Sequence, residues 1–188
     1  IVFSLLDLEK PIISAVNGWC MGAGSWLALS CHMTYAAESA VFAQPEVRMI
    51  SNTDVIWPVL AGYKDALRYS FTGDHIDAGE ALRIGLVNEV VPDNRLIDEC
   101  FELVERIALV SPETVKINLA VATSGLEMMG FDQASVMNAE LNASVHGSQR
   151  EDFRRNLNEA MERGGLREFI QARDGPFRPE PFGPYSKE

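Results

Sequence analysis

The stretch that decides the fold is PIISAVNGWCMGAGSW, at residues 11–26. Its first half, residues 11–18, is apolar, rich in β-branched side chains and closed by Asn-Gly, which predicts a buried strand that ends in a tight turn. Gly22 and Gly24 then open an apolar segment that we interpret as a buried helix. A strand, a glycine turn and a helix in this order predict an α/β unit.

Further elements follow on the C-terminal side of this unit. Two more strands are expected at residues 33–36 and 40–43, ahead of a Pro-Glu turn. Asp77 is placed to cap a helix over residues 78–84, and Gly85 is placed to end that helix in a left-handed conformation. The first half of the chain is therefore expected to alternate short strands and helices.

Helical periodicity dominates after residue 92. Apolar residues recur at helical spacing from Leu96 to Ile107, and Ser111-Pro112-Glu113 is a helix N-cap followed by a first-turn proline and an acid. More helices are expected at residues 132–145, 150–163 and 166–173. We therefore expect an α/β core over residues 1–92 and, over residues 93–188, a helical region that forms a subdomain or an oligomer interface.

Charge and cysteine content exclude several classes of function. The chain has 188 residues, with 16 Lys+Arg against 27 Asp+Glu and a formal net charge of −11. This acidity argues against binding to nucleic acid or to an anionic membrane, because both require a basic face. No run reaches the ~18 apolar residues of a membrane-spanning helix. The three cysteines (Cys20, Cys31 and Cys100) show no metal-ligand spacing and favour a reducing compartment, the cytoplasm.

Four motifs resemble, in their order and spacing, the enoyl-CoA hydratase/isomerase (crotonase) superfamily. They are NGWCMGAG at residues 17–24, FAQPEV at 42–47, FTGDHIDA at 71–78 and GLVN at 85–88. The resemblance implies a crotonase-like fold, in which a ββα superhelix core carries a C-terminal helical trimerisation region. It also implies an acyl-CoA substrate, with coenzyme A as part of the substrate and no tightly bound cofactor or metal, and self-association as a trimer or a dimer of trimers.

The chain starts inside this pattern. Residues 1–6 have neither an initiator methionine nor the basic flank of a signal peptide. What is present resembles the C-terminal two thirds of a family member, with the N-terminal part missing. A core without its opening strands would expose sheet edges, so we expect a longer polypeptide or a disordered N-terminal part.

The resemblance also implies an oxyanion hole, in which two backbone N–H groups hold the thioester carbonyl. The second donor falls on Ala23, and Gly22 and Gly24 on either side would let a substrate approach the backbone. The physics of helix ends supports this role, because the first N–H groups of a helix lack partners and carry the positive end of its dipole. The alternative is that the glycines only allow close packing of helix and strand. The first donor is expected before Ile1.

Two carboxylates are the candidate acid/base groups. Hydratases of the family use two glutamates that share a water, and only the second is present, as Glu46; the first position holds Trp26, whose indole cannot transfer a proton in water addition. Asp54 matches the working aspartate of dienoyl-CoA isomerases and aromatic-CoA dehalogenases, or is simply a helix N-cap. If Glu46 and Asp54 face one cavity, burial and repulsion raise the pKa of at least one of them.

The remaining candidates concern substrate binding. Trp26 and Trp57 would favour a flat, cyclic or shortened acyl group, although two tryptophans also fit a plain core. The phosphates of coenzyme A need local cations, and the candidates are Lys64 and Arg68, with Arg48, Arg167 and Arg173 as further possibilities. The histidines are expected at the surface or at helix ends rather than in catalysis: His32, His75 and His146.

These observations favour an acyl-CoA enzyme that stabilises a thioester enolate, with Glu46, either alone or together with Asp54, moving protons. Isomerase, hydratase (a lyase) and hydrolase reactions stay open, and Trp26 makes the hydratase reaction less favoured than the other two. A second reading is a non-catalytic crotonase-like subunit that serves binding or assembly, because the first glutamate and the first oxyanion donor are absent. A third is a hydrolase that cleaves a C–C bond of a cyclic diketone without coenzyme A.

Overall fold

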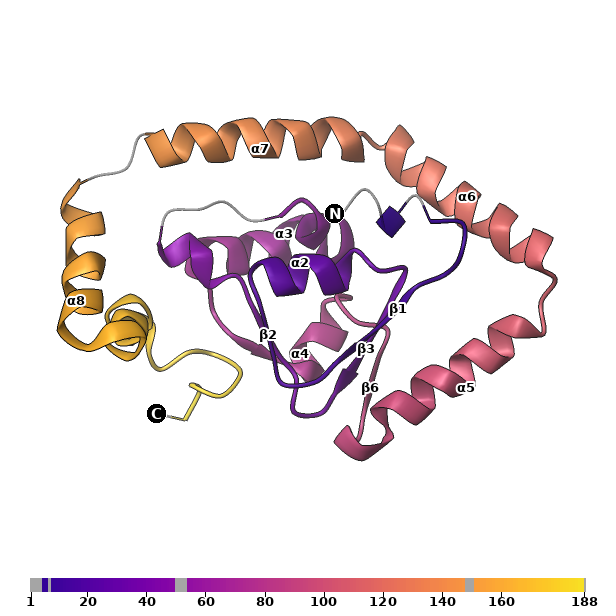
Figure 1. Cartoon of the computed structure of the whole chain (residues 1–188), viewed down its shortest axis with the longest axis horizontal. Helices are drawn as coiled ribbons and strands as arrows, with labels where there is room; N and C mark the ends of the chain where they lie inside the picture. The colour runs from indigo at the N-terminus through magenta and orange to yellow at the C-terminus, as the bar shows by residue number, and fades with distance from the viewer. Residues whose placement is uncertain (1–4, 7, 50–53, 148–150, 188) are drawn as a thin grey trace.

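The α/β part of the chain contains two small sheets (Figure 1). The structure is a computed structural model that describes residues 5–6, 8–49, 54–147 and 151–187. One sheet is parallel, with strand order β1-β3-β6: β1 (Ile13–Val16), β3 (Met33–Ala37) and β6 (Glu89–Val91). In the other sheet β4 pairs in parallel with β2 and antiparallel with β5: β2 (Trp19–Met21), β4 (Val41–Ala43) and β5 (Ile76–Asp77). The first half of the chain therefore alternates short strands and helices, as predicted.

Some of the strands lie where the sequence predicts them, and one does not. β1, β3 and β4 lie within or next to the predicted strands, because their apolar and β-branched residues fill the interior. β2 was not predicted: it is only three residues long and lies between Gly18 and Gly22, too short to show a two-residue period. Its pairing with β4 sets Cys20 opposite Phe42.

Short helices connect the strands. The helix α2 (Ala23–Leu29) follows β2, and the 3-10 helix η1 (Pro45–Arg48) follows β4 where a turn was expected. The helix α3 (Ile56–Thr72) is kinked at Gly62, and α4 (Ala78–Arg83) precedes β6. The predicted cap of α4 is confirmed, because Asp77 Oδ1 accepts a hydrogen bond of 2.8 Å from the backbone N–H of Glu80.

The larger of two hydrophobic clusters in the described residues joins both sheets to α2, α3 and α4. Its largest side chains are at most 2% exposed: Leu29, Phe42, Trp57, Tyr69 and Ile76. Burying each such side chain stabilises the fold by about 1.5–3 kcal/mol. The strands and helices that carry the candidate site are therefore held in place by this core.

The second half of the chain is helical and passes around the α/β core (Figure 1). It comprises η2 (Asp93–Arg95), α5 (Leu96–Ala108), α6 (Pro112–Met128), α7 (Phe131–Gly147), α8 (Glu151–Asp174) and η3 (Gly175–Phe177). α5 contacts β1 and β3, while α8 bends at Gly164 and Gly165 and contacts η1. Large apolar side chains stay exposed on α5, α6 and α7: Ile97, Phe101, Ile117, Val121, Met137 and Leu141. Exposed apolar surface of this extent is typical of protein interfaces.

Candidate active site

The centre of the candidate site is the contact between η1 and the start of α2. Gly22, which precedes α2, donates a backbone hydrogen bond of 3.1 Å to the carbonyl of Ala43 at the end of β4. This bond brings Gly22 next to Glu46, whose Oε2 lies 3.2 Å from the position that a Cβ on Gly22 would occupy. Gly22 has φ +50°, a conformation that glycine adopts readily. The glycine therefore provides both the turn and the space for the carboxylate.

The Glu46 carboxylate is buried without a hydrogen-bond partner. The residue is 9% exposed, and within the described part of the chain neither carboxylate oxygen accepts a hydrogen bond. Burial raises the pKa of Glu46 and the nearby charge of Asp54 raises it further, whereas its own backbone N–H and the charge of Arg173 lower it. The indole N–H of Trp26 lies near the carboxylate but outside hydrogen-bonding geometry. A carboxyl group with a raised pKa is suited to exchanging protons near neutral pH.

Asp54 lies next to Glu46 and also caps α3. Its Oδ1 accepts a hydrogen bond of 2.8 Å from the backbone N–H of Ile56, and its own N–H donates to Gln44 Oε1 at 3.2 Å. Burial raises the pKa of Asp54. The capping role considered from the sequence is therefore observed, and it coexists with a position within electrostatic reach of Glu46.

Three buried N–H donors belong to the segments that carry these residues, α2, the Gln-Pro-Glu turn and α3, and have no hydrogen-bond partner among the residues that the structure describes. They are Trp26 Nε1, Gln44 Nε2 and Trp57 Nε1. Trp57 is fully buried and packs against Tyr69 with ring centroids 6.3 Å apart. Gln44 was missed from the sequence, although it belongs to the same Gln-Pro-Glu motif as Glu46. Unpartnered buried donors are uncommon and mark positions where a ligand or water completes the hydrogen bonding.

The start of α2 is open to a ligand. Ala23 and Gly24 are exposed, and a Cβ on Gly24 would meet no atom within 4 Å. No side chain in the described ranges caps the helix at Gly22, and the N–H groups of a first helical turn have no acceptor within the helix. An oxygen that carries negative charge would be stabilised at this position.

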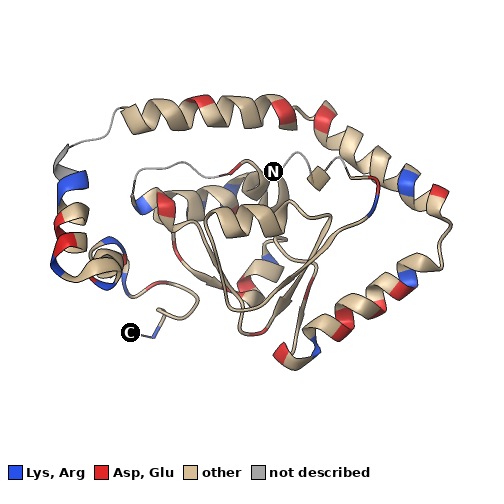
Figure 2. Cartoon of the chain, viewed as in Figure 1, with Lys and Arg blue, Asp and Glu red and all other residues tan. Residues whose placement is uncertain are grey.

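The candidate cations for the phosphates of coenzyme A differ in their surroundings. Lys64 is exposed on α3, and Arg68 is exposed while stacking over Phe182 at 5.2 Å from the ring centroid. Arg173 is paired with Asp174 through two contacts of 2.8 Å. Figure 2 shows that basic residues also occur on α8, which includes the exposed Arg167.

Arg48 is not a surface cation, so its candidacy for phosphate binding was wrong. The residue is 4% exposed, and its guanidinium group forms ion pairs with Asp74 at 3.1 Å, Asp174 at 3.3 Å and Glu180 at 3.0 Å. The three carboxylates already occupy the donors that a phosphate would need.

His75 also differs from the prediction, because it is buried rather than at the surface. It is 3% exposed, its backbone N–H donates to Glu180 Oε2 at 2.6 Å, and its Nδ1 lies 2.9 Å from the same carboxylate. His32 accepts a hydrogen bond of 3.0 Å at Nδ1 from the backbone N–H of Ile12, and His146 lies in the last turn of α7. His75 therefore ties the C-terminal segment to the core.

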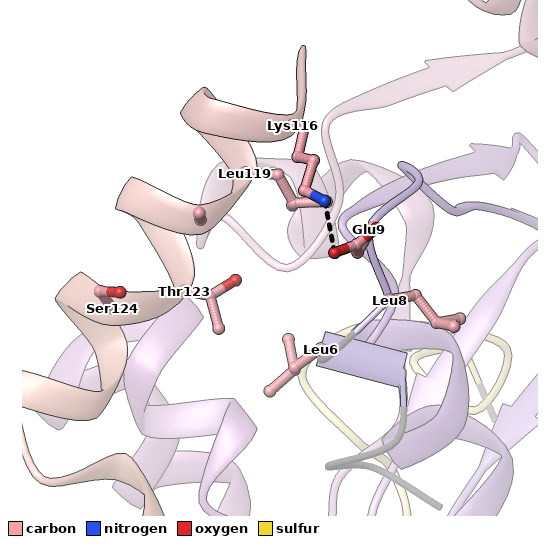
Figure 3. Close-up of a pocket in the computed structure, with 8 residues that line it drawn as sticks. Leu6, Leu8, Glu9, Lys116, Leu119, Thr123 and Ser124 are labelled. Carbon is pink, nitrogen blue, oxygen red and sulfur yellow. Dashed lines mark ion pairs between the residues drawn. The ribbon is translucent and has the colours of Figure 1, made fainter. Parts of the chain in front are cut away.

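A pocket of about 230 Å³ lies elsewhere, between the N-terminal segment and α6. Figure 3 shows its lining residues, with Glu9 and Lys116 joined by an ion pair of 2.5 Å across its rim. Within the described ranges, no three His, Cys, Asp or Glu residues are grouped so that they could hold a metal ion. No helix in these ranges combines the length and the apolar character needed to cross a membrane.

Comparisons with known proteins agree on one family. The sequence model described as enoyl-CoA hydratase/isomerase matches residues 2–177. A crotonyl-CoA hydratase of Syntrophomonas wolfei is 37% identical over 145 residues, which cover 74% of this chain and 55% of that protein. A short-chain-enoyl-CoA hydratase of Clostridium acetobutylicum is 38% identical over 132 residues, which cover 67% and 50%. The chain thus spans about half the length of the curated relatives that it matches.

Solved structures point to the same family and confirm the predicted crotonase-like fold. An enoyl-CoA hydratase/isomerase from Xanthobacter autotrophicus Py2 superposes with a TM-score of 0.86 at 31% identity, covering 94% of this chain and 66% of that one. A monofunctional enoyl-CoA isomerase from M. smegmatis superposes with a TM-score of 0.60 at 32% identity, covering 67% and 61%. The proteins that this chain resembles therefore include some named as hydratases and one named as an isomerase.

Proposed function

The chain belongs to the enoyl-CoA hydratase/isomerase family, and from this premise we propose that it acts on an acyl-CoA by moving a proton with Glu46 while the backbone N–H of Ala23 stabilises the enolate oxygen. The observation that carries the proposal is the buried, unpartnered carboxylate of Glu46 against Gly22, one residue before Ala23. In our proposal the anion-stabilising donor and the proton-transfer group are therefore neighbours.

The proposed reaction is a shift of a carbon–carbon double bond. In a 3-enoyl thioester, ionised Glu46 removes a proton from C2, and the electron pair moves to the thioester oxygen as an enolate. The Ala23 N–H holds this oxygen, since a helix N-terminus favours negative charge. Glu46, now protonated, returns the proton to C4, and the product is the 2-enoyl thioester. No atom is gained or lost, so one carboxylate is sufficient.

Trp26 favours this reaction over addition of water. Water addition by the two-glutamate route needs a second carboxylate on α2, and the indole of Trp26 occupies that position next to Glu46. An indole N–H donates a hydrogen bond but does not exchange its proton near neutral pH. In our proposal Trp26 therefore orients Glu46 or the acyl group, while Asp54 tunes the pKa of Glu46.

The other contacts with substrate are assigned by position. We propose that Gly22 and Gly24 let the thioester reach the backbone, that Trp57 shapes the acyl pocket from the core side, and that Lys64 and Arg68 attract the phosphates of coenzyme A. The exposed apolar faces of α5, α6 and α7 support self-association as a trimer or a dimer of trimers. A cytoplasmic location, inferred from the cysteines, stays a prediction.

Turnover in D2O tests the reaction. The chain is incubated with 3-enoyl-CoA and, separately, with 2-enoyl-CoA thioesters of short and cyclic acyl groups, and the products are analysed by mass spectrometry. We expect double-bond migration, deuterium incorporated at carbon and little hydration. In Glu46→Gln the migration and the deuterium incorporation should both be lost. Unchanged turnover in Glu46→Gln would refute the role of Glu46.

Calorimetry with acetoacetyl-CoA, an enolate mimic, separates the enzyme from a non-catalytic subunit. An enzyme of this type binds the mimic and turns over at least one thioester. Binding without turnover of any thioester would indicate a binding or assembly subunit. Hydrolysis of a cyclic diketone that lacks coenzyme A would instead support the C–C hydrolase reading.

A further inference from the structure

The C-terminal segment is bound to the turn that carries Glu46 by a buried cluster of charges. Arg48 lies at its centre, two residues after Glu46 in η1. Its side chain is 1% exposed, and its carboxylate partners come from three separate places: Asp74 after α3, Asp174 at the end of α8, and Glu180 near the C-terminus. Buried ion pairs that share several partners hold their segments together, because losing one partner leaves another charge unpaired in the interior.

Further contacts of Arg48 and Glu180 fix the positions of their side chains. Arg48 Nε donates a hydrogen bond of 2.7 Å to the carbonyl of Thr72, and the ring of Phe177 lies 4.1 Å from the guanidinium carbon. Glu180 is fully buried at its side chain and also accepts from the backbone N–H of His75. The position of Arg48, and with it the backbone of η1, is thus defined from α3, from α8 and from the C-terminal segment.

Two routes connect this cluster to Glu46. The first is the backbone, because Arg48 and Glu46 share one short 3-10 helix, in which the N–H of Met49 donates to the carbonyl of Glu46 at 2.9 Å. The second is charge, because Asp174 pairs with both Arg48 and Arg173. Arg173 lowers the pKa of Glu46 and is the cation that faces it from α8.

We propose that Arg48 is a positioning residue for Glu46, which it holds in the reactive orientation by joining the C-terminal segment, through Asp174 and Glu180, to the turn that carries Glu46. This inference rests on the proposed acid/base role of Glu46. It extends the functional unit to residues that lie 126 and 132 positions away from Arg48 in the sequence. The charged groups that act on Glu46 are then Arg173 from α8 and Asp54 ahead of α3, with the neutral Trp26 on the side of α2.

Glu180→Gln tests the proposal, because it removes one charge from the cluster while keeping the shape of the side chain. Glu102→Gln is the matched control: Glu102 also pairs with an arginine, Arg95, at 2.8 Å, but this pair is exposed on the surface of α5. Arg48→Lys keeps the positive charge at position 48 and tests whether that charge alone preserves the position of Glu46. Each variant is assayed for kcat, KM and the pH profile of kcat/KM, and the Glu46 carboxyl is titrated by 13C NMR in glutamate-labelled protein, assigned with Glu46→Gln.

We expect Glu180→Gln to lower kcat by about fivefold or more with little change in KM, because a small displacement of a proton-transfer group reduces the rate more than binding. The pKa of Glu46 should rise, since Arg173 is held less firmly near it, and the acid limb of the profile should move to higher pH. Arg48→Lys should show a smaller change in the same direction, and Glu102→Gln none.

The outcomes separate this inference from the proposed function. Wild-type kcat and an unchanged Glu46 titration in Glu180→Gln, together with an inactive Glu46→Gln, would overturn the role of Arg48 and leave that of Glu46 standing. An active Glu46→Gln would refute the proposed function, and the NMR titration would still report whether Arg48 positions the carboxyl. If Glu180→Gln does not fold, Asp174→Asn replaces it, because Asp174 pairs with the same Arg48 Nη1 at 3.3 Å and belongs to the same proposed link.

Discussion

Glu46 lies against Gly22, with Oε2 of its carboxylate 3.2 Å from the position where a Cβ on Gly22 would be. The contact joins the two segments to which our proposal assigns the chemistry: Glu46 would move the proton, and the backbone N–H of Ala23, next to Gly22, would hold the oxygen. A side chain at position 22 would therefore disturb both halves at once.

Gly22→Ala should disturb the site as well as the fold. The positive φ of Gly22 is strained for any other residue, which costs about 1–3 kcal/mol, and the added methyl group would displace the Glu46 carboxylate. We expect a lower free energy of unfolding, a lower kcat and a changed pKa of Glu46. Gly18→Ala is the control: Gly18 also has a positive φ, but a Cβ there meets no atom within 4 Å. Equal effects of both variants on kcat would contradict the role of the contact.

Glu46→Gln should stabilise the protein at neutral pH. Burial raises the folded-state pKa of Glu46, so folding favours its protonated form, and the associated stability is present at low pH and lost as the pH rises through the folded-state pKa. Replacing the buried, unpartnered carboxylate by an amide should therefore raise the free energy of unfolding on the order of 1 kcal/mol at pH 8, and by less at pH 4. Urea unfolding at several pH values measures this difference.

Glu80→Gln should show the opposite pH dependence. The Arg83 guanidinium, bonded to Glu80 at 2.6 Å, lowers the pKa of that carboxyl, so its stabilisation is present above the unfolded-state pKa and is lost as the pH falls through the folded-state value. The substitution should destabilise by about 1 kcal/mol at pH 8 and less in acid. If Glu46→Gln and Glu80→Gln respond to pH with the same sign, one of the two assignments is wrong.

Substitution of Asp54 separates its capping role from its charge. Asp54→Asn keeps an acceptor for the N–H of Ile56, so stability should be nearly unchanged, whereas Asp54→Ala loses the cap and about 1 kcal/mol. Both remove a negative charge that raises the pKa of Glu46, so the acid limb of kcat/KM should move to lower pH in both variants. A profile that stays in place would show that Asp54 acts on the helix alone.

Arg48→Met should be among the most destabilising single changes. It leaves the carboxylates of Asp74, Asp174 and Glu180 buried without Arg48, which typically costs about 3–5 kcal/mol. Arg95→Met removes an arginine with as many carboxylate partners, but these pairs are exposed and should contribute little to stability. Thermal unfolding of the two variants measures the contrast, and similar melting temperatures would contradict it.

Much of the fold could be predicted because its signals are local. The apolar run that ends at Asn17-Gly18, the Asp77 cap and the helix that starts after Ser111 each depend on neighbouring residues, and all three are present. The short strand β2 was missed because its existence depends on pairing with β4 rather than on its own three residues.

Candidate site residues that belong to contiguous motifs could be predicted from the sequence. The distant residues that hold them in place could not. Glu46 was identified because its motif is contiguous in the sequence. The burial of His75 and Arg48 depends on Glu180, which lies 105 and 132 residues away, and no local pattern indicates such a pairing. The buried orientation of Gln44 likewise depends on Asp54, because Gln44 Oε1 accepts a hydrogen bond from the backbone N–H of Asp54.

The pairing of Arg48 with Glu180 also bears on the order of events during synthesis. A ribosome adds about 5–20 residues per second, so the 132 residues between Arg48 and Glu180 take on the order of ten seconds to emerge. For most of that interval Asp74 is the only carboxylate partner of Arg48 that has been synthesised, so η1 lacks the contacts that come from α8 and from the C-terminal segment. We therefore expect η1, which carries Glu46, to be fully anchored only after the strands of both sheets have been synthesised.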